Sequence, residues 1–213
     1  MARDPRSPVL FLRSFADDPV MAFGGGSSRA RRLAEIVTGR ASRLEEVIAR
    51  ELAAWGPVIA IGQPGEPLPE LGAARFYEGD DTWRAAITSI VPRARIIVVV
   101  VADTEGLAWE LSEIDRLGRS DAVIYVMPPV AKKETVRRWR RLADLTQNRT
   151  LRLLASRRDA SEARVALRLK ADAYAMIVAK RIAELDFELA TRLASFVLIG
   201  EPKAAPPEGS DAR

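Results

Sequence analysis

An unbroken run of β-branched residues near the middle of the chain constrains the fold most. Residues 96–102 read IIVVVVA, and no polar residue interrupts them. A strand with one face in water alternates polar and apolar residues, whereas a strand in the centre of a parallel sheet is covered by helices on both faces and shows no alternation. The run therefore predicts a central, doubly buried strand in an α/β fold.

Strand-like and helix-like segments alternate on both sides of this run. Short apolar segments bounded by turn residues predict further strands at residues 9–13, 57–61, 122–127 and 150–154. Apolar residues at helical spacing predict helices at residues 42–55, 81–91, 103–117 and 132–145, the first opened by a capping box of Ser42 and Glu45. This order predicts a doubly wound, five-stranded parallel sheet with the flavodoxin-like strand order 2-1-3-4-5.

The remaining segments are expected to be additions to one domain that spans residues 1–200. Residues 19–40 are rich in Gly and Ser and predict a flexible insertion, and a Pro/Gly-rich loop follows at 62–72. The composition of residues 201–213 predicts a disordered tail.

Residues 156–198 predict a C-terminal helical extension. Within it, residues 164–170 alternate like a strand or begin the helix predicted at 173–194. A wide apolar stripe on this helix indicates burial on two sides, by the sheet and by a second subunit. The stripe consists of Val178, Ile182, Leu185, Leu189, Leu193 and Phe196, and it is widened by Met176, Ile177 and Phe187.

Composition narrows the possible chemistry. The 213 residues include no histidine and no cysteine, which excludes Ser-His-Asp triads, thiolate nucleophiles and metal sites built on Cys or His. Composition leaves oxygen-ligated Mg²⁺ or Ca²⁺ possible, but no calcium-loop motif is present, so we expect no metal. The net charge of +4 comes from dispersed arginines without a nucleic-acid motif, so we do not expect nucleic acid as a partner. No apolar run approaches the ~20 residues that cross a bilayer, and we expect a cytoplasmic protein.

One glutamate breaks the apolar pattern of the helix that follows the central strand. On a helical wheel Glu110 falls inside the buried arc, while Trp109 and Glu113 lie at its margin. A carboxylate there is costly unless it is paired, for instance with Arg13 or Arg95, or borders a cavity. The position also lies close to the carboxyl end of the strand, where α/β sheets bind ligands. The arc itself consists of Leu107, Leu111, Ile114 and Leu117.

Two motifs resemble those of Toll/interleukin-receptor (TIR) domains. The segment FLRSFADD at residues 11–18 resembles their first-strand motif, and EGLAWELSEI at residues 105–114 resembles the helix that carries the catalytic glutamate of TIR-type NAD⁺ hydrolases. The order of elements over residues 9–154 is similar to that of a bacterial TIR-like domain, with the Pro/Gly-rich loop in the position of the BB loop.

The spacing within the second motif leaves two glutamates open. The commoner TIR arrangement places the glutamate four residues after the tryptophan, which here is Glu113. Glu110 follows Trp109 directly, which is closer to nucleoside 2-deoxyribosyltransferases and to some TIR-like sensor domains. We favour Glu110, with Glu113 as its rival.

The resemblance implies a function. It implies cleavage of the nicotinamide–ribose bond of NAD⁺, which is the substrate and not a cofactor, in signalling or antiphage defence. A carboxylate would stabilise the oxocarbenium-like transition state. The implied substrate-binding residues are Arg13, Ser14, Phe15, Asp103, Thr104 and Trp109, although packing would equally explain Phe15 and Trp109, and capping Thr104.

Two alternatives remain beside this reading. In the first, the chain is a non-catalytic module that self-associates through the BB-like loop and the C-terminal helix. In the second, it is an enzyme similar to nucleoside 2-deoxyribosyltransferases that uses Glu110 as nucleophile.

Overall fold

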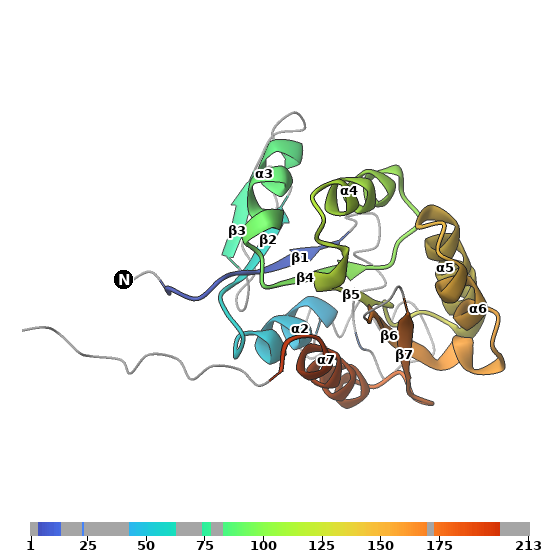
Figure 1. Ribbon diagram of the computed structural model, residues 1–213. Coiled ribbons are helices and arrows are strands. Elements are labelled where there is room, and N and C mark those ends of the chain that lie inside the picture. The colour runs from blue at the N-terminus through green and yellow to red at the C-terminus, as the bar shows by residue number, and fades with distance from the viewer. Residues whose placement is uncertain are drawn as a thin grey trace, which may run out of the picture.

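A computed structural model describes residues 4–13, 23, 43–62, 74–77, 83–169 and 173–200, with the backbone alone at 61–62 and 74–77 (Figure 1). The insertion predicted at 19–40, apart from residue 23, the body of the Pro/Gly-rich loop and the tail at 201–213 lie outside these ranges, as do Ser14, Phe15 and Ser42.

The described strands form one seven-stranded mixed sheet in the order β3-β2-β1-β4-β5-β6-β7. The first five strands of this order are parallel, and β6 and β7 are antiparallel to their neighbours. The strands are β1 (Val9–Leu12), β2 (Val58–Gly62), β3 (Ala74–Tyr77), β4 (Ile96–Val100), β5 (Val123–Val126), β6 (Ala163–Arg168) and β7 (Tyr174–Val178).

The prediction for the central strand is confirmed. Strand β4 lies between β1 and β5, and every one of its residues is at most 1% exposed. Alternate residues of the strand enter two separate apolar clusters, one on each face of the sheet. The lack of alternation in IIVVV thus reflects burial on both faces.

Helices cover both faces of the sheet and make a three-layered α/β domain (Figure 1). Helices α2 (Leu44–Leu52) and α7 (Glu184–Ile199) cover one face. The other face is covered by α3 (Trp83–Ile90), α4 (Glu105–Arg116), α5 (Lys132–Leu145) and α6 (Arg149–Ala155). Short 3₁₀ turns lie at Val91–Arg93, Ser120–Ala122 and Arg158–Glu162.

The predicted five-stranded, all-parallel sheet is wrong in its extent. Strands β2-β1-β4-β5 have the arrangement of the first four positions of the order 2-1-3-4-5, but β3 extends one edge and the β6–β7 pair extends the other. The fifth predicted strand, at 150–154, is helix α6. Asn148 caps this helix by accepting a hydrogen bond from Leu151 N at 3.0 Å. Leu151 and Ala155, one helical turn apart, are both buried, as expected for a helix packed on one side.

The C-terminal helical extension is also corrected. The strand alternative for residues 164–170 is confirmed by β6. Residues 174–178 form the further strand β7, so the last helix begins at Glu184 rather than near residue 173. The sheet side of the predicted wide stripe is confirmed at Phe187, which is buried, whereas its leucines face away from the sheet. Phe187, Ala190 and Ala194 face the sheet, while Leu185, Leu189, Leu193 and Phe196 are 50–53% exposed.

The first helix begins one residue later than its predicted capping box requires. Arg43 occupies the cap position, and its backbone N–H donates to Glu46 Oε2 at 3.1 Å. Glu45, the predicted partner of Ser42, instead pairs with Arg13 at 3.1 Å. Among the helices of the described ranges, none is long and apolar enough to span a membrane.

Candidate functional site

The candidate site lies at the carboxyl edge of the parallel strands, where β4 leads into α4. Thr104 caps α4, because its hydroxyl oxygen accepts a hydrogen bond from Leu107 N at 3.4 Å. The cap turns the chain sharply after the strand and places the first turns of α4 above the sheet edge. This is the usual position of ligands in open α/β sheets. The capping interpretation of Thr104 is confirmed.

Glu110 lies in the second turn of α4 and is half-buried. Within the part of the chain that the structure describes, its carboxyl group has no hydrogen bond and no ion pair. Burial raises the pKa of Glu110 from 4.5 to about 8. The side chain is therefore mostly neutral at pH 7, and a cation placed beside it would favour its ionised form. The ion pair considered for it, with Arg13 or Arg95, is not formed among these residues.

Glu113 is held in a different way. Its carboxylate accepts a hydrogen bond from Thr88 Oγ1 and two from the guanidinium of Arg116, all at 2.7 Å. The hydrogen bonds from Arg116 and then from Thr88 lower the pKa of Glu113 to about 2. Because Thr88 belongs to α3, these contacts join α3 to α4. Glu113 is thus fully engaged in packing two helices together.

Trp109 also joins α3 to α4. Its ring meets Trp83 edge to face, with centroids 4.8 Å apart and an interplanar angle of 72°. The guanidinium carbon of Arg84 lies 5.2 Å from the centroid of Trp83 and 5.4 Å from that of Trp109. These aromatic and cation–π contacts give Trp109 a role in packing α3 against α4, which is the alternative to substrate binding.

The structure does not bring Arg13 beside Glu110. Arg13 continues the alternation of Val9 and Phe11, which face α2, and its side chain pairs with Glu45 of that helix. Glu110 belongs to α4 on the opposite face of the sheet. The backbone of Arg13 lies at the shared edge, but its guanidinium points away from the site.

Asp103 lies at this edge and is bound by α5. It forms ion pairs with Arg137 and, at 3.2 Å, with Arg141. The hydrogen bond from Arg137 is the main cause that lowers the pKa of Asp103. Among the predicted residues, Asp103 and Thr104 therefore follow β4 at this edge and Glu110 lies in the second turn of α4, while Ser14 and Phe15 lie outside the described residues.

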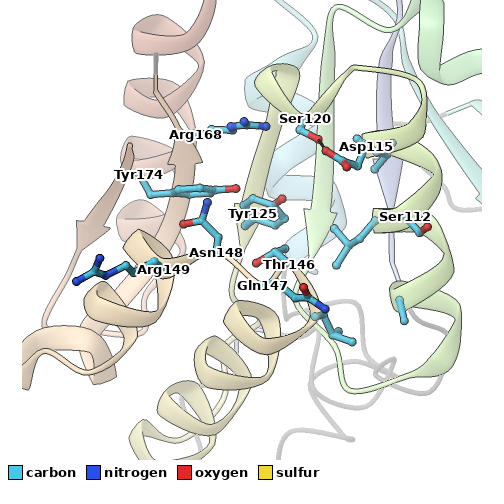
Figure 2. Close-up of a pocket in the computed structure, with 14 residues that line it drawn as sticks. Ser112, Asp115, Ser120, Tyr125, Thr146, Gln147, Asn148, Arg149, Arg168 and Tyr174 are labelled. Atoms are coloured by element: carbon cyan, nitrogen blue, oxygen red, sulfur yellow. Dashed lines mark hydrogen bonds between the residues drawn. The ribbon is translucent and has the colours of Figure 1, made fainter. Parts of the chain in front are cut away.

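A second feature was missed by the sequence analysis. An open cleft of about 520 Å³ lies on the other flank of α4, between that helix, the sheet and the turn from α5 to α6 (Figure 2). Its lining residues come from seven elements and the α5–α6 turn, scattered between positions 108 and 174, and no local motif unites them. In the residues that the structure describes, no group of three or more Asp and Glu side chains could hold a metal ion.

Comparison with known proteins finds no family model, no curated protein and no solved structure that matches this chain.

Proposed function

We propose that this chain is a TIR-like NAD⁺ glycohydrolase that cleaves the nicotinamide–ribose bond, with Glu110 as its catalytic carboxylate. The observation that carries the proposal is the contrast between the two candidate glutamates. Glu110 is half-buried and unpaired among the described residues at the carboxyl edge of the sheet, whereas the carboxylate of Glu113 is saturated by Thr88 and Arg116. Only the first is disposed to meet a substrate.

The chemistry of the substrate suits such a carboxyl group. The nicotinamide ring of NAD⁺ is cationic, and its approach would lower the raised pKa of Glu110 and ionise it. As the C1′–N bond breaks, its electron pair goes to nicotinamide, which leaves neutral, and the positive charge moves to the ribose. A carboxylate beside the ribose stabilises this charge. Water then bonds to C1′ and gives up a proton, which the ionised carboxylate accepts once the positive charge on the ribose is gone.

The test is release of nicotinamide from NAD⁺ by the purified chain. We expect turnover by the wild type, a loss of at least ~100-fold in Glu110→Gln, typical for removal of a catalytic acid–base group, and retained activity in folded Glu113→Gln. A folded, assembled wild type without turnover would contradict the proposal. Transfer of deoxyribose between bases, tested in parallel, would support the transferase alternative.

A non-catalytic assembly role is a second candidate, and the outer face of α7 favours it. Leu185, Leu189 and Leu193 recur every fourth residue, and Phe196 and Val197 extend the stripe. All five are 50–53% exposed. The charged residues Glu184 and Arg192 of this helix are paired within the chain, with Arg50 and Glu51, so the apolar stripe itself would carry the contact.

This stripe fits a second copy of the chain. Five half-exposed side chains offer only a few hundred Å² per protomer, less than the ~800 Å² per partner of a stable interface, so association should be weak and concentration-dependent. Sedimentation across a concentration series tests it. Leu189→Glu should keep the chain monomeric, whereas Arg152→Glu, on exposed α6, should behave as wild type. Identical sedimentation of all three would remove this candidate.

A further inference from the structure

The cleft beside α4 is built on two tyrosines. Tyr125 of β5 and Tyr174 of β7 lie on the same face of the sheet, with ring centroids 6.2 Å apart and a tilt of 33°. They are only 3% and 9% exposed, so both phenol rings lie almost wholly out of contact with water. Burial raises the pKa of Tyr125 well above its usual value. Both rings therefore give the cleft a rigid floor of neutral phenols.

An arginine stands beside these phenols. Arg168 lies opposite Tyr174 in the antiparallel β6–β7 pair, and its charge acts on Tyr125. Figure 2 shows its guanidinium reaching from β6 toward Ser120 of the far wall. Arg149 adds a second positive charge at the rim. Guanidinium and phenol groups together are donors suited to an oxyanion.

The far wall supplies an acceptor. Asp115 of α4 lines the cleft, and the Ser120 hydroxyl donates to its Oδ1 at 2.9 Å, which fixes the carboxylate. A fixed carboxylate accepts hydrogen bonds from hydroxyl groups of a ligand. With two arginines against one aspartate, the lining has a net charge of +1, which favours an anion over a neutral molecule.

The turn from α5 to α6 forms the remaining wall, and it includes one residue in an unfavourable backbone conformation. Gln147 has φ of 49°, the only positive φ at a non-glycine residue in the described chain. Glycine is the usual residue in this position after a helix, because it reaches the left-handed region without strain. A glutamine here lowers the stability of the fold and places an amide group on the cleft wall, beside Asn148. Strained non-glycine backbone of this kind is concentrated at functional sites.

We propose that this cleft binds a phosphate monoester with a hydroxylated carbon skeleton, such as a sugar phosphate or a nucleoside monophosphate. The phosphate would meet Arg168 and the tyrosine hydroxyls, and the ligand hydroxyls would meet Asp115. A volume of about 520 Å³ falls within the range of small-molecule sites. A phosphate group, with a charge near −2 at pH 7, suits the net positive lining better than a ligand carboxylate with a charge of −1 does.

Isothermal titration calorimetry tests the proposal with five probes: ribose 5-phosphate, AMP, ribose, adenosine and inorganic phosphate. Ribose 5-phosphate or AMP should bind at least tenfold more tightly than ribose or adenosine. Tighter binding of AMP identifies a nucleotide site, and equal binding of the two esters identifies a sugar phosphate site. Binding of inorganic phosphate alone, or of no probe at millimolar concentration, would overturn the proposal.

Matched variants locate the binding. Arg168→Gln should weaken ester binding at least tenfold, and so should Tyr174→Phe, which keeps the ring and therefore the packing. Arg152→Gln is the control, because Arg152 is an exposed arginine of α6 paired with Asp144 and does not line the cleft. Unchanged ester affinity in both folded test variants would refute the assignment. Glu110→Gln, on the other flank of α4, should bind the ester normally, so this result stands apart from the proposed hydrolase activity.

Discussion

Replacing Glu110 by glutamine should make the protein more stable, although it removes the proposed catalytic group. The folded chain holds this carboxyl group at a pKa of about 8, against an ordinary value of 4.5. Because the folded pKa is the higher one, the folded state is favoured below pH 4.5 and loses stability as the pH rises through 8. Glutamine has nearly the same shape and carries no charge at any pH, so it avoids this loss.

The magnitude follows from the two pKa values. Each pH unit between them costs ~1.4 kcal/mol, so the ionisable side chain would cost ~3 kcal/mol at pH 7 if it were fully shielded from water. Since Glu110 is half-buried, screening by water reduces this to ~1–2 kcal/mol. For a chain of this length that corresponds to a rise in Tm of ~2–8 °C.

Urea denaturation at pH 4, 6, 7 and 9 measures the effect. The free energy of unfolding of Glu110→Gln should equal that of the wild type near pH 4 and exceed it increasingly up to pH 9. Glu113→Gln is the matched control, and it should be destabilised at pH 7 because it loses its charge-assisted bonds to Arg116 and weakens that to Thr88. A difference between Glu110→Gln and the wild type that is independent of pH, or of opposite sign, would refute the reasoning.

Four further substitutions, at three positions, test the fold and the cleft. Gly56→Ala should destabilise the chain by ~1–3 kcal/mol in urea denaturation, since the added Cβ would lie 2.2 Å from the carbonyl oxygen of Ser7. Gln147→Gly should raise the free energy of unfolding by ~0.5–1 kcal/mol by relieving the left-handed backbone, and calorimetry should show weaker ester binding. Arg164 is 1% exposed, with Nη2 unpaired in the described chain, so Arg164→Met should be neutral or stabilising in thermal denaturation, whereas Arg164→Ala, which leaves a cavity, should lose ~2–4 kcal/mol.

The elements that could be predicted from the sequence are those with long and unambiguous patterns. The strand β4 and the helices α4 and α5 could be predicted because a continuous apolar run and a helical spacing of apolar residues are both visible in a short stretch of sequence. Residues 150–154 and 174–178 are short apolar runs that suit either a strand or a helix. Their state is decided by the cap at Asn148 and by pairing of β7 with β6, and neither is visible in a local window.

The candidate site was predictable to the same degree. The helical wheel singled out Glu110 because a carboxyl group in an apolar arc is a local signal, but it placed Glu113 only at the margin, whereas Glu113 is buried and Glu110 half-buried. It did not reveal that Glu113 reaches Thr88, or that Arg13 turns toward Glu45, since these contacts join residues 25 and 32 positions apart. The cleft around Tyr125 and Tyr174 depends on long-range pairing throughout and left no pattern in the sequence.

The most direct test of the proposed function is the pH dependence of nicotinamide release from NAD⁺. If Glu110 acts as a carboxylate, kcat/KM should rise with pH and level off above about 8, the pKa of this group in the free protein. Folded Glu110→Gln should show no such rise and at most ~1% of the activity. Turnover by the wild type that is unchanged in Glu110→Gln, or absent at every pH, would contradict the proposed function.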